Sequence, residues 1–196
     1  RGDFIARMDA DDEMLPNRLQ LQLDAFGADS TLDVCGMSSI ISQKTVSLNF
    51  LSHKEIVASL FFSNPIVHPT VMFKLSENLN IEYKNVVCED YELWTSLALQ
   101  GAIFENLSAP GLIYHRSSNQ KSMQESHLVA GEAILIAGRY TECKGLPFKE
   151  RLIDINYTFD KVDYRKLKQE LFLFKDKPIF DISKVDNYYF KRLIKR

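Results

Sequence analysis

The sequence predicts an α/β domain followed by a basic, mostly helical C-terminal appendage. Three observations predict it: short apolar stretches alternate with helix-forming stretches, Gly and Pro mark their boundaries, and the composition changes after Tyr140. Hydrophobic residues make up 45% of the 196 residues and charged residues 26%, which excludes a wholly disordered chain. We place the α/β domain in residues 1–122 and the appendage in residues 123–196.

The expected elements follow from apolar spacing and turn residues. The first half of the chain is expected to hold, in order, a strand over Phe4–Met8, a helix near Pro16, a strand over Leu32–Ile41, a polar turn at Ser42–Thr45, a helix over His53–Phe62 and an extended segment over Val67–Phe73 that His68-Pro69 interrupts. A helix over Tyr91–Gln100, strands over Ala102–Asn106 and Leu112–His115, a polar turn at Ser117–Ser122 and a helix over Glu125–Ala137 follow. Leu19, Leu21 and Leu23 alternate as in a strand, but Pro16 suits the first turn of a helix and decides for one. Gly101 is a good C-terminal stop for the helix with the clearest apolar stripe.

Composition and charge exclude several classes of protein. The chain has 24 basic and 26 acidic side chains, a net charge of −2, which excludes a generally basic nucleic-acid binder. Cys35, Cys88 and Cys143 are odd in number and far apart, which fits a reducing, cytoplasmic compartment. No apolar run approaches the roughly 20 residues that span a bilayer, and the N-terminus lacks a signal-peptide core. It also lacks an initiating Met, so we expect the chain to be the C-terminal part of a longer protein.

An acidic turn follows the first predicted strand. Asp9, Asp11 and Asp12 place three carboxylates within four residues. Carboxylates this close repel unless a cation or hydrogen-bond donors offset their charge, and Mg²⁺ or Mn²⁺ with a bound diphosphate would do so. The spacing alone is equally compatible with a solvated loop or a cap for the helix near Pro16.

A second acidic pair, Glu89-Asp90, directly precedes the helix that carries Trp94. A carboxylate at a helix N-terminus stays ionised and can act as a general base toward a substrate hydroxyl. An ordinary acidic helix cap explains the pair as well. Trp94 lies on the apolar stripe, so we expect it in the core, with its edge as a candidate lining of a cleft.

Two histidines are further candidates. Pro69 favours an extended backbone at His68, which can present the imidazole or leave it as an ordinary loop residue. His115-Arg116 ends a predicted strand, where the Arg fork of donors could meet a phosphate or serve only as a polar strand end.

Taken in order, several segments resemble the family 2 inverting glycosyltransferases of the GT-A fold, in particular bacterial enzymes of surface-polysaccharide assembly. The segments are GDFIARMDADD (2–12), LPNRL (15–19), DVCG (33–36), NPIVHPTVMF (64–73), EDYELW (89–94) and, more weakly, YHRSSNQKS (114–122). The resemblance implies a GT-A-like mixed sheet flanked by helices, incomplete at the N-terminus. Residues 1–122 would then be the C-terminal half of the catalytic domain, without the N-terminal nucleotide-binding half, and inactive as an isolated fragment.

The resemblance also implies roles for the candidate residues. Asp11 would coordinate Mn²⁺ or Mg²⁺, Asp9 would contact the nucleoside or assist at the metal, and Asp90 would be the catalytic base of an inverting displacement. His68 would lie near the cleft between donor and acceptor. The remaining candidates are Glu89, Trp94 and Arg116 for substrate binding and His115 for the metal, although relatives usually have Arg at position 115 and often His at position 117.

The implied partners are a nucleotide-sugar donor, most often a UDP-sugar in this family, and a glycan or lipid-linked acceptor. Residues Lys161–Arg196 hold eleven basic and five acidic side chains, a net charge of +6. Such a tail is either a solvated surface or a contact with the anionic inner face of the plasma membrane. Two other functions stay open at this point: a non-catalytic remnant or interaction module of a truncated glycosyltransferase, and another phosphate-handling enzyme such as a nucleotidyltransferase.

Overall fold

A computed structural model describes residues 2–41, 44–46, 51–61, 63–115 and 126–144. The predicted α/β fold with a mixed sheet is confirmed. The elements are β1 (Phe4–Ala6), β2 (Glu13–Met14), α1 (Arg18–Ala28), β3 (Val34–Ile41), β4 (Lys44–Val46), α2 (His53–Ser59), the 3₁₀ turn η1 (His68–Thr70), β5 (Met72–Lys74), α3 (Glu89–Leu99), β6 (Phe104–Tyr114) and α5 (Ser126–Cys143).

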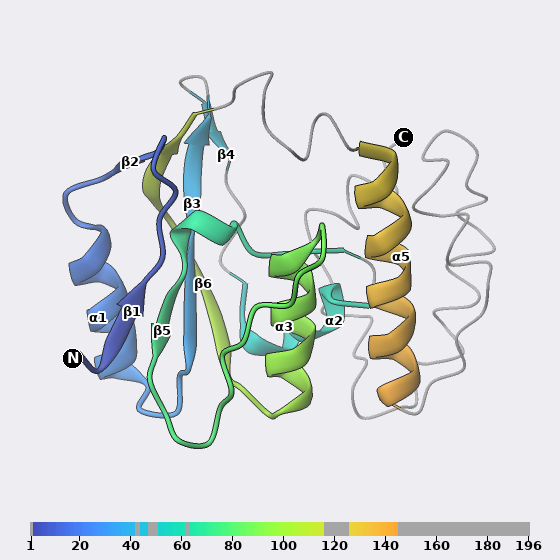
Figure 1. The fold of residues 1–196 in the computed structure, drawn as a ribbon. Helices are drawn as coiled ribbons and strands as arrows, with labels where there is room; N and C mark the ends of the chain where they lie inside the picture. Colours follow the sequence, from blue (N-terminus) through green and yellow to red (C-terminus); the bar gives the residue numbers. More distant parts are fainter. Residues whose placement is uncertain (1, 42–43, 47–50, 62, 116–125, 145–196) are drawn as a thin grey trace.

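One sheet runs through the middle of the molecule, in the order β1-β5-β3-β6-β2, with β4 paired to β3. The central pair β3–β6 is parallel, and the other pairs are antiparallel. Helix α1 lies on one side of the sheet, α2 and α3 lie on the other, and α5 packs on the outer side of α3 (Figure 1). The ends of β1, η1 and α3 carry the residues discussed below.

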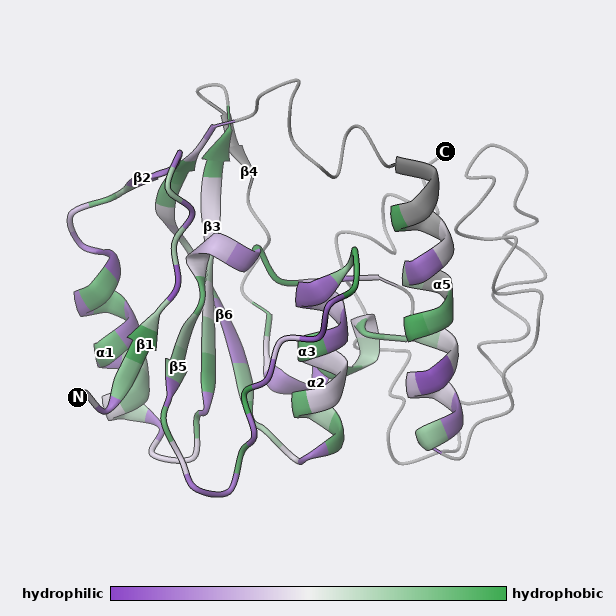
Figure 2. Ribbon diagram, in the orientation of Figure 1, coloured by the Kyte–Doolittle hydropathy of each residue, from purple (hydrophilic) through white to green (hydrophobic). Residues whose placement is uncertain are grey.

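The main hydrophobic core lies between the sheet and helices α2, α3 and α5. Trp94, Leu97 and Ile56 are fully buried in it, together with Ile136 and Tyr140 of α5. Figure 2 shows hydrophobic and hydrophilic bands alternating along α3 and α5, as expected for helices that bury one face. Because α5 shares this core with α3, the described part of the appendage is packed onto the α/β domain; the division at residue 122 stays a prediction.

Helix α1 reverses the usual distribution of polar and apolar residues. Its buried side carries Arg18 and Gln22, whereas Leu19, Leu21 and Leu23 are 37–40% exposed. Gln22 Nε2 donates to the carbonyls of Cys35 (2.7 Å) and Thr70 (2.8 Å), and Arg18 Nη2 donates to those of Arg7 (2.7 Å) and Val71 (3.3 Å). These bonds satisfy buried backbone acceptors and tie α1 to the segments after β1 and around η1.

The structure corrects some predicted elements. The two strands predicted over Ala102–Asn106 and Leu112–His115 are one strand, β6, whose pairing with β3 shifts register on both sides of Ser38. The shift accommodates the intervening residues, which include Pro110. The interruption predicted at His68-Pro69 is present and is the 3₁₀ turn η1.

Other predictions hold or lie outside the described residues. Gly101 has φ 92° after α3, the left-handed conformation typical of a helix stop. The helix predicted over Glu125–Ala137 is α5 and runs to Cys143. The turn at Ser117–Ser122 and the tail Lys161–Arg196 lie outside the described residues. Within the described part of the chain, no helix has the length and apolar character needed to cross a membrane.

Candidate active site

The acidic turn after β1 holds its three carboxylates in different ways. Asp9 Oδ1 pairs with Arg7 Nη2 at 2.7 Å, Asp11 is exposed, and Asp12 is buried. Asp12 Oδ1 accepts a hydrogen bond from the backbone N–H of His115 (3.0 Å), which anchors the turn to the end of β6. Its Oδ2 is buried without a hydrogen-bond partner among the described residues. Burial raises the pKa of Asp12, and the charges of Asp9 and Asp11 raise it further.

Asp90 lies in the first turn of α3 and is held on both of its oxygens. Oδ2 accepts from Asn64 Nδ2 at 2.6 Å, and Oδ1 accepts from the backbone N–H of Tyr91 at 2.8 Å. Burial raises the pKa of Asp90, while these two hydrogen bonds lower it and the charge of exposed Glu89 raises it. The balance is a carboxylate whose basicity exceeds that of a free aspartate, which suits a general base.

His68 faces Tyr83 and Trp94. Its Nε2 lies 2.9 Å from the Tyr83 hydroxyl, and its ring packs edge-on against Trp94 with 5.8 Å between ring centroids. Burial lowers the pKa of His68 to about 4, and the charge of Arg7 lowers it further, so the imidazole is neutral at physiological pH.

Arg7 connects the acidic turn with the other candidates. Besides pairing with Asp9, its side chain interacts with the Tyr83 hydroxyl, whose pKa also responds to the charges of Glu89 and Asp90. The charges of Arg7 and Asp9 likewise act on His68. Asp9, His68, Glu89 and Asp90 therefore lie around one place, with Arg7 and Tyr83 between them.

The carboxylates of the acidic turn fit a hard divalent cation in their chemistry. The turn holds three carboxylates, and Arg7 pairs with Asp9 alone, so its formal charge stays negative. In the described parts of the chain, no three His, Cys, Asp or Glu side chains cluster closely enough to hold a metal ion by themselves. A cation would need further ligands, and a bound diphosphate is one source of oxygen donors.

The remaining predicted residues are placed less centrally. Trp94 is fully buried between His68 and Phe73 and so has no exposed surface. His115 is exposed and its Nε2 lies 3.3 Å from Glu13 Oε1. Arg116 lies outside the described residues.

Sequence reasoning missed three residues of this site. Asn64 and Arg7 were given no role of their own, although they lie in the segments 64–73 and 2–12. Both lie in segments that were singled out, so a charged or amide side chain next to those motifs was the available signal. Tyr83 lies in the loop between β5 and α3, where no spacing marks it.

A separate hollow of about 590 Å³ lies between α1, α2 and the start of β6. Its lining includes Ala25, His53 and Glu105 and none of the predicted site residues. We therefore place the candidate active site at the carboxylates and not at this hollow.

Comparisons with known proteins show similarity to glycosyltransferases. Residues 1–84 match the model of the family Glycosyl transferase family 2. Residues 1–84 are therefore similar to the family 2 glycosyltransferases. The chain is 33% identical over 132 residues to the O-antigen biosynthesis glycosyltransferase WbnJ of Escherichia coli, covering 61% of this chain and 50% of that protein. It is 29% identical over 160 residues to the bifunctional glycosyltransferase pgtA of Dictyostelium discoideum, covering 59% of this chain and 20% of that protein.

The family match corrects one prediction. We expected a C-terminal portion that lacks the N-terminal half of the family 2 glycosyltransferase domain. The match covers the N-terminal region of the chain, from residue 1 to residue 84, so this interpretation is wrong. The chain spans half or less of the two relatives that it matches.

Proposed function

We propose that this protein catalyses metal-dependent, inverting transfer of a sugar from a nucleotide-sugar donor to a hydroxyl of a glycan or lipid-linked acceptor. The observation that carries the proposal is Asp90, a half-buried carboxylate of raised pKa that accepts hydrogen bonds on both of its oxygens. Its charge acts on Tyr83, as does the side chain of Arg7, which pairs with Asp9 of the acidic turn. The relationship to an O-antigen biosynthesis glycosyltransferase supports a role in surface-polysaccharide assembly.

In the proposed mechanism, Asp90 accepts the proton of the acceptor hydroxyl as its oxygen attacks the anomeric carbon of the donor. The bond to the nucleoside diphosphate breaks on the opposite side, so the anomeric centre is inverted. The hydrogen bonds that Asn64 and the Tyr91 N–H donate hold the Asp90 carboxylate in its orientation. Ionisation of Asp90 before attack is required, and its raised pKa makes it a stronger base once it is ionised.

Asp11, with Asp9, would hold Mn²⁺ or Mg²⁺. The ion would stabilise negative charge on the departing diphosphate when it is bound. The backbone N–H of His115 is hydrogen-bonded to Asp12, which places His115 next to the acidic turn. His115 is the third proposed metal ligand. Asp9 has a second proposed role toward the nucleoside, for which it would exchange its partner Arg7.

Substrate contacts are proposed for His68, Glu89 and Arg116, and an indirect role for Trp94. His68 is supported by its position beside Tyr83, and Glu89 by its exposure next to Asp90. The burial of Trp94 supports an indirect contribution, through the support that its ring gives to His68.

UDP is the proposed nucleotide, and nucleic acid is not a proposed partner. The +6 charge of Lys161–Arg196 supports a peripheral contact with an anionic membrane face on the cytoplasmic side.

The experiment is to incubate the chain with Mn²⁺, a panel of UDP-hexoses and candidate acceptors, and to measure UDP release. Asp90→Asn should abolish release while UDP binding by calorimetry persists. Asp11→Ala should abolish the Mn²⁺-dependent binding itself. Release by Asp90→Asn at the normal rate would refute the base assignment. A chain that neither binds UDP nor releases it would favour a non-catalytic interaction module.

A further inference from the structure

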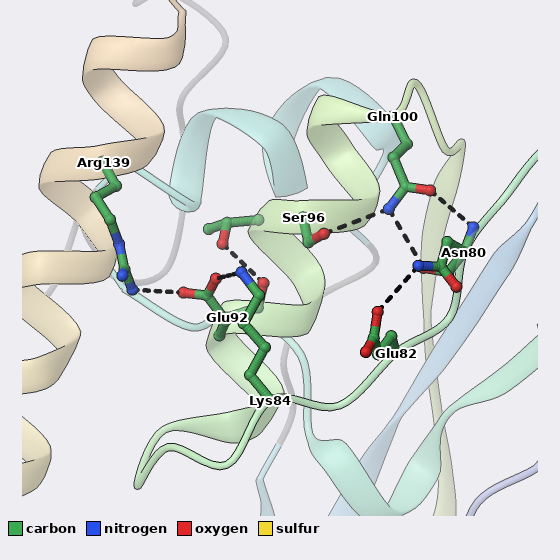
Figure 3. A network of polar contacts seen from close by, with 8 residues as sticks. Asn80, Glu82, Lys84, Glu92, Ser96, Gln100 and Arg139 are labelled. Carbon is green, nitrogen blue, oxygen red and sulfur yellow. Dashed lines mark hydrogen bonds and ion pairs between the residues drawn. The ribbon is translucent and has the colours of Figure 1, made fainter.

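Two side chains of α5 contact α3 on either side of Asp90. Glu132 Oε2 accepts a hydrogen bond from the backbone N–H of Cys88 at 2.7 Å. Arg139 Nη2 donates to Glu92 Oε2 at 2.7 Å (Figure 3). Seven residues separate Glu132 from Arg139, which is about two helical turns, so both lie on one face of α5. The contacts therefore bracket the first turn of α3 just before and just after the Glu89-Asp90 pair.

Glu92 joins three elements at one buried carboxylate. Its side chain is only 9% exposed, and its other oxygen pairs with Lys84 of the loop between β5 and α3 (Figure 3). Lys84 is the neighbour of Tyr83, which faces His68. A buried carboxylate with a cation on each oxygen has a restricted orientation, so Glu92 fixes the loop, α3 and α5 relative to one another.

The same loop is also tied to the far end of α3. Gln100 Oε1 accepts from the backbone N–H of Asn80 at 2.8 Å, and Gln100 Nε2 donates to the Asn80 carbonyl at 3.3 Å. Figure 3 shows these contacts beside the one between Asn80 and Glu82. The loop segment that carries Tyr83 is thus held along α3 at two points.

The contact of Glu132 completes the N-terminus of α3. The side chain of Cys88, the N-cap residue of α3, makes no capping hydrogen bond, and Glu132 supplies an acceptor for the backbone N–H of Cys88. Cys88 Sγ makes a second contact, to the Val129 carbonyl of α5 at 3.3 Å.

We propose that Glu132 and Arg139 are positioning residues, which act through Cys88 and Glu92 to fix the first turn of α3 and thereby the orientation of Asp90. The apolar contacts of Ile136, Ala137 and Tyr140 also hold α5 against the core. Apolar contacts are not directional, whereas the two polar contacts fix both the rotation and the height of α3. The consequence for turnover rests on the proposed function of Asp90.

The first test measures hydrogen exchange of backbone amides by NMR in the full chain. The Tyr91 amide is the reporter because it donates directly to Asp90 Oδ1. In Arg139→Gln and Glu132→Ala, exchange at Tyr91 and Glu92 should accelerate about tenfold or more, with amides of β3 unchanged. Arg139→Lys keeps the cation that pairs with Glu92, and Glu132→Gln keeps an acceptor for the Cys88 N–H, so backbone amides of both variants should exchange as in the wild type. Glu142→Gln, an exposed change on the same helix, is the matched control.

The second test measures UDP release from UDP-hexoses with Mn²⁺. Arg139→Gln should lower kcat about tenfold with an unchanged KM for the donor, and Arg139→Lys should restore kcat. Unchanged Tyr91 exchange in both loss variants, or a rise of the same size in β3, would overturn the positioning role. Turnover by Asp90→Asn would overturn the base assignment alone, because the exchange result does not depend on activity.

Discussion

The N-terminus of α3 and the turn after β1 both present carboxylates, but they hold them differently. Asp90 is half-buried, accepts hydrogen bonds on both oxygens and lies between two contacts from α5. In the acidic turn, Asp11 is exposed and Asp9 pairs with a neighbouring cation. A group that moves a proton benefits from a fixed orientation, whereas ligands of an exchangeable ion can complete their arrangement on binding. The comparison suggests that one half of the site is preformed.

The largest expected effect comes from removing the ionisable group of the preformed half. Wild-type kcat/KM should fall as the pH falls through the raised pKa of Asp90, because only the ionised carboxylate accepts a proton. Asp90→Asn should lower kcat by about 10²–10⁴-fold and remove this acid limb. The pH dependence of UDP release measures both. An acid limb that persists in the variant would assign it to another group.

The next largest effect is expected from Gln22, one of the two buried polar residues of α1 that bond to neighbouring segments. Gln22→Leu removes the donor to the Cys35 and Thr70 carbonyls and the acceptor for Arg18. Buried groups left without partners cost about 1–3 kcal/mol each, so we expect a loss of roughly 2–4 kcal/mol in the free energy of unfolding. Urea titration measures it.

The matched control is the neighbouring substitution Leu23→Gln. Leu23 is 40% exposed, so this change should stay within about 0.5 kcal/mol. Equal stability of the two variants would contradict the conclusion that α1 buries Gln22 and exposes Leu23.

Helix α1 also shows how far the sequence alone leads. Its existence was predictable from Pro16, and the order of the longer strands and helices followed from apolar spacing and turn residues. The short strands β2 and β4 were not predicted, and β4 overlaps the predicted polar turn at Ser42–Thr45. Which face it buries was not predictable, because the buried side is chosen by carbonyls of Cys35, Thr70 and Val71. Those acceptors come from other segments and exist only in the folded chain.

The candidate site divides in the same way. Asp9, Asp11 and Asp90 could be predicted as site residues because a carboxylate at a strand end or a helix start is recognisable from the neighbouring sequence. Arg7, Asn64 and Tyr83 are recognisable as site residues only from contacts with residues distant in the sequence. The hydrogen bond between Asn64 and Asp90, which are 26 positions apart, is an example. The split of β6 into two predicted strands failed for a related reason, since pairing with β3 continues across a register shift.

A smaller effect is expected from His68, which lies between the two halves. Burial lowers its pKa to about 4 from an unfolded value of 6.5, so the unfolded chain binds more protons between these values. Stability should therefore fall as the pH falls from 6.5 to 4, by on the order of 2 kcal/mol after allowance for partial exposure. Urea titrations at pH 7 and pH 4.5 measure the loss, and Trp94, the single tryptophan, reports unfolding. In His68→Gln this part of the loss should be absent; an identical pH dependence would contradict the assignment.

Asn64 provides a finer test of the preformed half. Its hydrogen bond lowers the pKa of Asp90, so Asn64→Ala should raise that pKa and move the acid limb of kcat/KM to higher pH. The expected kcat at high pH is closer to wild type than that of Asp90→Asn, because the base remains. Glu89→Gln removes a charge that raises the pKa and should move the limb to lower pH. Shifts in the same direction would contradict this assignment of hydrogen bond and charge.

The smallest effect on the chain by itself is expected at the exposed carboxylate of the acidic turn. Because the Asp11 side chain is exposed, Asp11→Asn should shift Tm by less than about 2 °C in the absence of metal. With Mn²⁺ and UDP the wild type should gain stability by mass action, and Asp11→Asn should lose that gain. Thermal unfolding with and without the two ligands measures this difference. Asp12→Ala is the contrasting variant: Asp12 accepts the hydrogen bond that anchors the turn to the His115 backbone, and alanine removes this acceptor, so Tm should fall whether or not the ligands are present. Equal behaviour of the two variants would remove the distinction between a carboxylate that builds the turn and one that is available to a ligand.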